Sequence, residues 1–232
     1  MSAVQICRWR TFPTAAELQA AAVQTILESA SRAIAARGRF DIVFAGGTTL
    51  PAIYEQLRDA ESEWQHWHIW YGDERCLPPD DSARNSLMAS QALLDHVPIP
   101  HEQIHPIPAE LGASDGAAAY SAELTGVGTF DLVLLGMGED GHTASLFPGY
   151  TWDHHPPAPA IPVKYAPKPP SERISLSASR LSDARQVIFL ITGEGKRHAV
   201  QQWREDSNLP VKAITPSAGV DVFLEAAASP SI

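Results

Sequence analysis

The chain has 232 residues, of which 44% are hydrophobic, with a mean hydropathy of -0.13 and a formal net charge of -10 at pH 7. This length and composition are typical of a globular protein with a substantial core. No apolar stretch approaches the ~20 residues that span a bilayer, and the N-terminus lacks the apolar segment of a secretory signal, so we expect a cytoplasmic protein without membrane contacts. The acidic balance argues against a nucleic-acid surface and means that a phosphorylated ligand needs a local basic site.

The two cysteines, Cys7 and Cys76, lie far apart in the sequence and form no CxxC pair. This predicts neither a disulfide framework nor a cysteine zinc site, and we expect two buried or half-buried thiols. Because Cys76 follows an arginine, an activated thiolate is an alternative. His66 and His68 can share one face of a strand, but no third ligand accompanies them. We therefore expect no metal.

Helix and strand signals alternate along the first part of the chain. Thr14 and Glu17 form a capping box that opens a helix, and Gly38 ends that helix. Buried strands are expected over 40–45 and 67–71, where apolar and aromatic residues dominate.

The later part of the chain continues this alternation. In order, we expect a helix around 88–93 ended by Pro98, a helix over 115–124, a strand over 130–135, a proline-rich surface loop over 156–170 with one short strand, strands over 172–177 and 186–192, a helix over 195–204 and a strand over 220–225. Alternating strands and helices predict an α/β fold with a doubly wound, mainly parallel, Rossmann-like sheet flanked by helices. We expect one domain over residues 1–232.

The stretch FDLVLLGMGEDGHTASLFP joins an apolar run of buried-strand length to a loop with three glycines. Glycine permits positive φ and close backbone approach, so such a loop can fold around a small anion. Within it, His142 is a candidate base at cellular pH, and Asp140 can orient its tautomer. The alternative is a histidine that is merely hydrogen-bonded in a loop.

Two other predicted strands also end in polar clusters. The GGTT sequence, residues 46–49, presents backbone amides and hydroxyls before a helix, where Thr48 or Thr49 is the expected N-cap. This sequence can bind a phosphate, and the alternative is a tight turn between a strand and a helix without a ligand. In GDER, Arg75 can clamp an oxyanion or phosphate beside a carboxylate, or it belongs to a solvated charge cluster. Because parallel strands share one carboxyl edge, we expect both segments and the His142 loop to face one crevice.

These segments resemble the 6-phosphogluconolactonase branch of the glucosamine-6-phosphate isomerase/6-phosphogluconolactonase family. The similar pieces, in family order from about residue 40 to 200, are AGGTTLP, GDER, LLGMGEDGHTASLFPG, PKPPSERISL and ITGEGKRHAV. The resemblance implies a Rossmann-like fold and hydrolysis of 6-phospho-glucono-1,5-lactone to 6-phosphogluconate. It implies no redox cofactor and no obligatory metal, with a phosphorylated sugar lactone as the small-molecule partner. We expect a monomer or weak homo-oligomer.

The resemblance also implies a role for each site residue. His142 would be the general base, Asp140 would support it, and Arg75 would face the substrate. Asn85 stands near a family asparagine position, although its spacing from GDER differs. The substrate- and phosphate-binding residues would be Gly46, Gly47, Thr48, Thr49, Asp73, Arg173 and Lys196.

Two other functions remain open for this sequence. The deaminase branch of the family carries a catalytic glutamate where this chain has Phe147, which favours the lactonase. A non-catalytic sugar-phosphate sensor would need an appended DNA-binding domain, and the chain has no room for one before residue 40.

Overall fold

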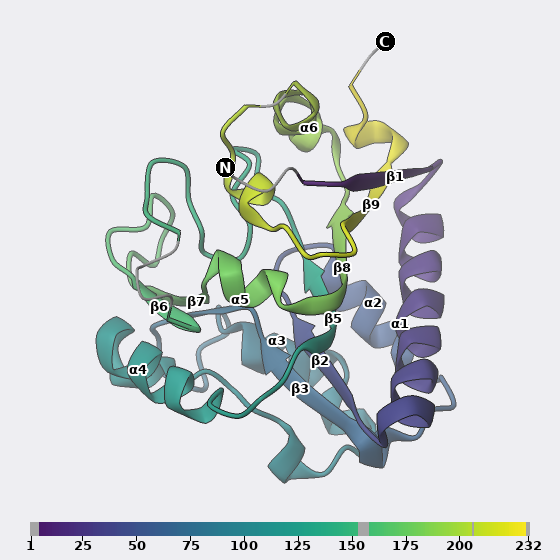
Figure 1. Cartoon of the computed structure of the whole chain (residues 1–232), viewed down its shortest axis with the longest axis vertical. Helices are drawn as coiled ribbons and strands as arrows, with labels where there is room; N and C mark the ends of the chain where they lie inside the picture. The colour runs from purple at the N-terminus through teal and green to yellow at the C-terminus, as the bar shows by residue number, and fades with distance from the viewer. Residues whose placement is uncertain (1–4, 153–157, 206, 231–232) are drawn as a thin grey trace.

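The main sheet has six strands, all parallel, in the order β1-β9-β8-β5-β2-β3 (Figure 1). The structure is a computed structural model that describes residues 5–152, 158–205 and 207–230. The strands are β1 (Cys7–Phe12), β2 (Phe40–Phe44), β3 (Trp67–Tyr71), β5 (Phe130–Leu135), β8 (Ala184–Ile191) and β9 (Val220–Glu225). All residues of β2 and β5 are buried, as in the central strands of a covered parallel sheet. The predicted fold class is confirmed.

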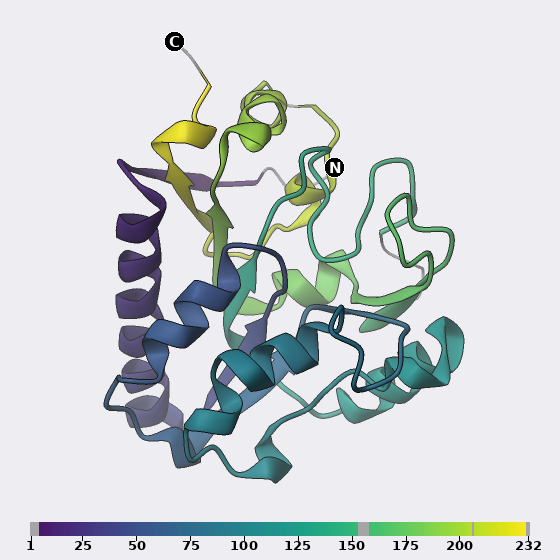
Figure 2. The same cartoon turned by 180° about the vertical axis from the view of Figure 1, so that it is seen from behind.

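Helices cover both faces of this sheet. The helix α1 contacts α2, which contacts α3, and Figure 2 shows α2 and α3 on one face, whereas α5 lies on the side that faces the viewer in Figure 1. The helices are α1 (Ala15–Arg37), α2 (Leu50–Leu57), α3 (Asn85–Ala92), α4 (Ala113–Glu123), α5 (Ala178–Ser182) and α6 (Arg197–Arg204). Within the described residues, no helix has both the length and the apolarity needed to cross a bilayer.

A second, antiparallel sheet has the order β4-β7-β6 and packs against α4. Its strands are β4 (Asp73–Arg75), β7 (Arg173–Leu176) and β6 (Ala160–Val163). The strand expected over 172–177 therefore lies outside the parallel sheet, and β4 was missed because GDER reads as a charged loop. This small sheet carries Arg75 and Arg173 opposite each other.

The ends of the elements confirm some predictions and correct others. Thr14 caps α1 by accepting a hydrogen bond from the Glu17 amide at 3.2 Å, and Gly38 ends α1 with φ of 74°. The strand β1 and the helix α5 were not predicted, whereas the helix expected around 88–93 is present as α3. Of the predicted loop over 156–170, residues 156–157 lie outside the described residues.

The strand order changes direction between β2 and β5. In the sheet, β3 lies on one side of β2. The strands β5, β8, β9 and β1 lie in that order on its other side. The loops that follow β2 and β5 therefore separate at their carboxyl ends, which is where open α/β sheets bind ligands.

Candidate active site

A cleft opens at this switch point, and it joins the segments that the sequence analysis expected to converge. Residues from the loops after β2, β5 and β8 line it together with residues of the small sheet. Nine of the predicted site residues are in the lining: Gly46, Gly47, Thr48, Thr49, Asp73, Arg75, His142, Arg173 and Lys196. Asp140, the tenth, lies directly behind His142.

His142 and Asp140 form a hydrogen-bonded pair in the loop after β5. Nδ1 of His142 lies 2.5 Å from Oδ1 of Asp140, so the ring proton is held on Nδ1 and Nε2 keeps its lone pair. The Phe147 ring packs against the imidazole, with ring centroids 4.8 Å apart. The pair thus has a fixed ring orientation and an Nε2 lone pair, which are the geometric requirements of a general base.

Two positions of this loop require glycine, one because neighbouring side chains come too close for a Cβ atom and one because its φ is positive. A Cβ atom on Gly138 would lie 1.9 Å from Nδ1 of His142 and 2.5 Å from Oδ1 of Asp140. Gly141 has φ of 77°, a conformation that side-chain-bearing residues rarely adopt. The loop also closes on itself, because the Gly138 amide donates to the carbonyl of His142 at 2.8 Å. The GMGEDGH sequence therefore specifies the position of the His142 imidazole.

Burial and charge act in opposite directions on this pair. Burial lowers the pKa of His142 below 6.5, although Asp140 raises it in part. Burial raises the pKa of Asp140, but the hydrogen bond and charge of His142, together with Lys168, bring it below its usual range. At neutral pH the imidazole is therefore neutral and the carboxylate ionised.

The loop after β2 meets the end of β8 at a pair of threonines. Thr49 occupies the N-cap position of α2, as expected, but its hydroxyl makes no capping hydrogen bond. Instead, Oγ1 of Thr49 lies 2.7 Å from Oγ1 of Thr192, another residue of the cleft. The N-terminus of α2, whose first residue Leu50 lines the cleft, is therefore left without a side-chain cap from Thr49.

Arg173 lines the cleft, and its guanidinium is hydrogen-bonded to the loop before β7. Its Nε donates to the carbonyl of Pro170 at 3.2 Å, and Nη2 donates to those of Lys168 and Pro169 at 3.1 Å. This loop carries Lys168 into the cleft, 3.9 Å from Asp140. Lys168 lies in the PKPPSERISL segment, from which only Arg173 was predicted as a site residue.

The cleft is more basic than the rest of this acidic protein. Lys196 reaches it from the segment before α6, where burial lowers its pKa and Glu139 opposes that shift. The charged residues of the lining are Asp73, Arg75, Lys168, Arg173 and Lys196. Four cations and one carboxylate therefore form the local basic site that the composition required.

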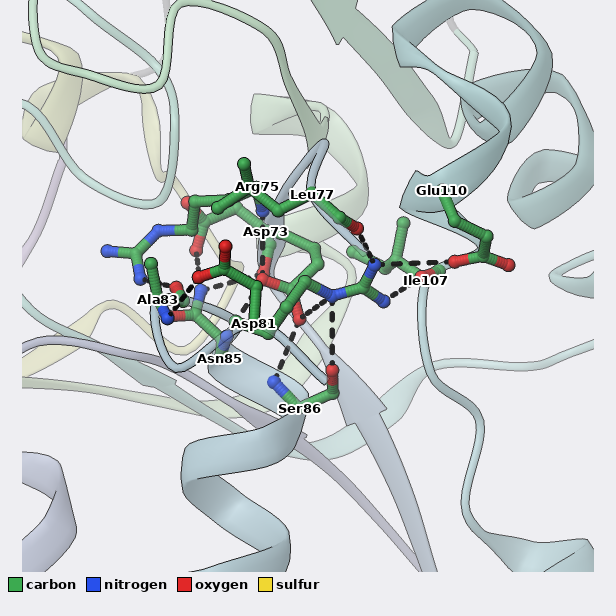
Figure 3. Close-up of polar contacts among 11 residues, drawn as sticks. Asp73, Arg75, Leu77, Asp81, Ala83, Asn85, Ser86, Ile107 and Glu110 are labelled. Carbon is green, nitrogen blue, oxygen red and sulfur yellow. Dashed lines mark hydrogen bonds and ion pairs between the residues drawn. The ribbon is translucent and has the colours of Figure 1, made fainter. Parts of the chain in front are cut away.

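Asp73 and Asn85 support the wall between the His142 loop and the GGTT loop. Asp73 accepts a hydrogen bond from Ser145 Oγ at 2.5 Å. It also accepts one from Asn85 Nδ2 at 3.2 Å (Figure 3). A Cβ atom on Gly46 would lie 2.0 Å from Asn85 Oδ1, so this glycine allows the amide to approach. Asn85 also lines the cleft.

The two cysteines do not form a nucleophilic site. Burial, with the charge of Glu172, raises the pKa of Cys76 to about 11, so this thiol is not an activated nucleophile. Both cysteines are free and half-buried. In the described part of the chain, no three His, Cys, Asp or Glu side chains cluster as metal ligands would.

The fold and cleft define an α/β protein whose Rossmann-like sheet presents a His–Asp pair beside a wall of cationic side chains. The family model for glucosamine-6-phosphate isomerases/6-phosphogluconolactonase matches residues 13–223. The chain belongs to this family.

Individual relatives agree with the family match. The 6-phosphogluconolactonase of Mycobacterium tuberculosis is 38% identical over 209 residues, which cover 82% of each chain. A probable chloroplastic 6-phosphogluconolactonase of Oryza sativa subsp. indica is 34% identical over 81% of this chain, which spans 64% of the rice protein. The structure of 6-phosphogluconolactonase from Trypanosoma brucei has a TM-score of 0.81 and 27% identity, covering 95% of this chain and 96% of that one.

Proposed function

We propose that the chain hydrolyses 6-phospho-glucono-1,5-lactone to 6-phosphogluconate, the second step of the oxidative pentose phosphate pathway. The observation that carries this proposal is the oriented His142–Asp140 pair in the same cleft as four cationic side chains. A buried phenylalanine, Phe147, packs against the imidazole at the position where the deaminase branch would need a carboxylate.

In this mechanism, Nε2 of His142 takes a proton from a water molecule while the water oxygen bonds to the lactone carbonyl carbon. The tetrahedral oxyanion faces Arg75, and donors placed in this way contribute about 10²–10³-fold to such rates. Collapse breaks the bond between that carbon and the ring oxygen. The ring oxygen takes the proton from His142, which regenerates the base.

The phosphate binds at the other end of the cleft. The uncapped N-terminus of α2, the cleft-lining residues 46–49 and the ammonium groups of Lys168 and Lys196 support this placement. Arg173 assists through the loop that its guanidinium holds. Because the phosphate is remote from the reacting carbon, its binding energy positions the ring. This chemistry needs no cofactor, and the proposed compartment is the cytoplasm.

The test follows 6-phosphogluconate formation from freshly generated lactone in a coupled assay, with glucosamine 6-phosphate as a parallel substrate. We expect lactone hydrolysis well above the spontaneous rate and no ammonia from the amino sugar. Ammonia release would indicate a deaminase, and binding of sugar phosphates without turnover of either substrate would indicate a sensor.

A further inference from the structure

Glu74 stands between two residues of the cleft but faces away from it. Side chains alternate across a strand, so in β4 Asp73 and Arg75 share one face while Glu74 points to the other. Asp73 and Arg75 line the cleft, whereas Glu74 is outside the lining and fully buried, at 0% exposure. A buried carboxylate is costly unless it is paired and hydrogen-bonded, so its partners matter.

The Glu74 carboxylate binds both ends of the segment that joins β4 to α3. Its Oε1 accepts hydrogen bonds from the amides of Arg75 and Asn85, each at 2.8 Å, and Oε2 accepts from the Ser86 amide at 2.8 Å. The N-cap residue of α3, Arg84, makes no side-chain cap. Glu74 therefore caps this helix from a different element, with its negative charge at the helix N-terminus.

Arg84 completes the arrangement as the charged partner of Glu74. Its Nε lies 3.2 Å from Oε2 of Glu74, and the side chain is only 3% exposed. Its other nitrogens donate to the carbonyls of Leu77 at 2.8 Å and Ile107 at 3.1 Å, as Figure 3 shows for these labelled partners. Glu110 adds an ion pair at 3.3 Å.

Because the charge of Glu74 is matched by Arg84, the guanidinium of Arg75 stays available to the cleft. Arg75 donates through Nη1 to the carbonyl of Ala83, but its buried Nε has no hydrogen-bond partner among the described residues. An unpaired buried donor of this kind costs free energy unless a ligand atom accepts from it.

We propose that Glu74 is a positioning residue, which together with Arg84 holds Arg75 and Asn85 in the cleft and keeps the Arg75 guanidinium free for the substrate. The inference rests on the proposed function, in which Arg75 faces the lactone carbonyl. It assigns to the glutamate of GDER a task separate from that of its two neighbours.

The test is the Glu74→Gln variant, which keeps the side-chain shape but loses the charge and one acceptor oxygen. The matched control is Asp131→Asn, which also alters a buried carboxylate that accepts from a backbone amide and pairs with an arginine, but at the amino end of β5. We expect kcat of Glu74→Gln to fall by about 10²-fold with a smaller change in KM, as for a reacting group displaced by ~1 Å. Asp131→Asn should lower Tm but keep kcat near the wild-type value.

Arg84→Lys is the second variant, used in particular if Glu74→Gln does not fold. It keeps a positive charge beside Glu74 but lacks the guanidinium nitrogens that donate to the Leu77 and Ile107 carbonyls. We therefore expect kcat to fall, as for Glu74→Gln. If the folded variants have the kcat of Asp131→Asn, Glu74 and Arg84 are only structural and the inference is wrong. A wild-type chain that fails to hydrolyse the lactone would instead overturn the proposed function.

Discussion

His142 combines two properties that a general base needs, a fixed ring and a neutral imidazole. The hydrogen bond to Asp140 fixes the ring, and burial lowers the pKa of His142. Asp140 acts against the second property, because its negative charge favours the protonated imidazole. Orientation and pKa are therefore set by different features of the same loop.

The pH dependence of activity tests this balance. In the proposed mechanism the neutral ring is the base, so kcat/KM should fall on acidification along a limb whose apparent pKa lies below 6.5. Asp140→Asn removes the charge that raises the pKa of His142, so the limb should move to lower pH while the plateau falls through lost orientation. The measurement is kcat/KM between about pH 5 and pH 8 for both proteins. A limb that stays in place would show that Asp140 does not interact with the titrating group.

Removal of Lys196 and removal of Arg173 from the cleft should have different effects on KM and Tm. Lys196→Ala deletes one charge-assisted contact to phosphate, so KM should rise by about 10- to 100-fold with Tm retained. Arg173→Ala should raise KM and also lower Tm, because the carbonyls of residues 168–170 lose their donor. KM and Tm are measured for both variants. A raised KM with unchanged Tm for Arg173→Ala would mean that its guanidinium acts only on the ligand.

At the scale of elements, the turn after β2 depends on a tyrosine of α2. The buried hydroxyl of Tyr54 accepts from the Ala45 amide at 3.0 Å and donates to the Ala45 carbonyl at 2.9 Å. Tyr54→Phe leaves both backbone groups unpaired, so the free energy of unfolding should fall by about 1–3 kcal/mol. Denaturant unfolding checks this value. A variant as stable as the wild type would mean that water replaces the hydroxyl.

The elements that were predicted correctly are those whose signals are local. The cap at Thr14 and the αL glycine at Gly38 define α1, and apolar runs define the buried strands. The edge strand β1 has the sequence CRWRTF, in which only Phe12 is buried, and its arginines obscure the pattern. The three-residue strand β4 is set by its pairing with β7, a contact about a hundred residues away that no local pattern contains.

The same distinction applies to the site. The glycine loops and His142 were predicted because their residue types are chemically specific. The contact between Thr49 and Thr192, the entry of Lys168 and the capping by Glu74 all depend on segments brought together by the fold. For Lys168 the available signal was its place in PKPPSERISL.

For the whole molecule, the prediction of one domain rests on a shared core. A single cluster of buried side chains takes residues from the main sheet, the small sheet and the helices. We therefore expect one cooperative calorimetric transition. At a free concentration of 100 times its Kd, 6-phosphogluconate should stabilise the folded chain by about 2.7 kcal/mol and move the transition as a unit. Two transitions, of which the product shifts only one, would contradict a single domain.

The central claim, that His142 activates the attacking water, is tested most directly by kcat of His142→Ala on freshly generated 6-phospho-glucono-1,5-lactone. We expect kcat to fall by about 10²–10⁴-fold with little change in KM, since the loss of a positioned base affects the chemical step and not phosphate binding. Retained binding of 6-phosphogluconate serves as the control for folding. A variant with wild-type kcat would remove His142 from the mechanism.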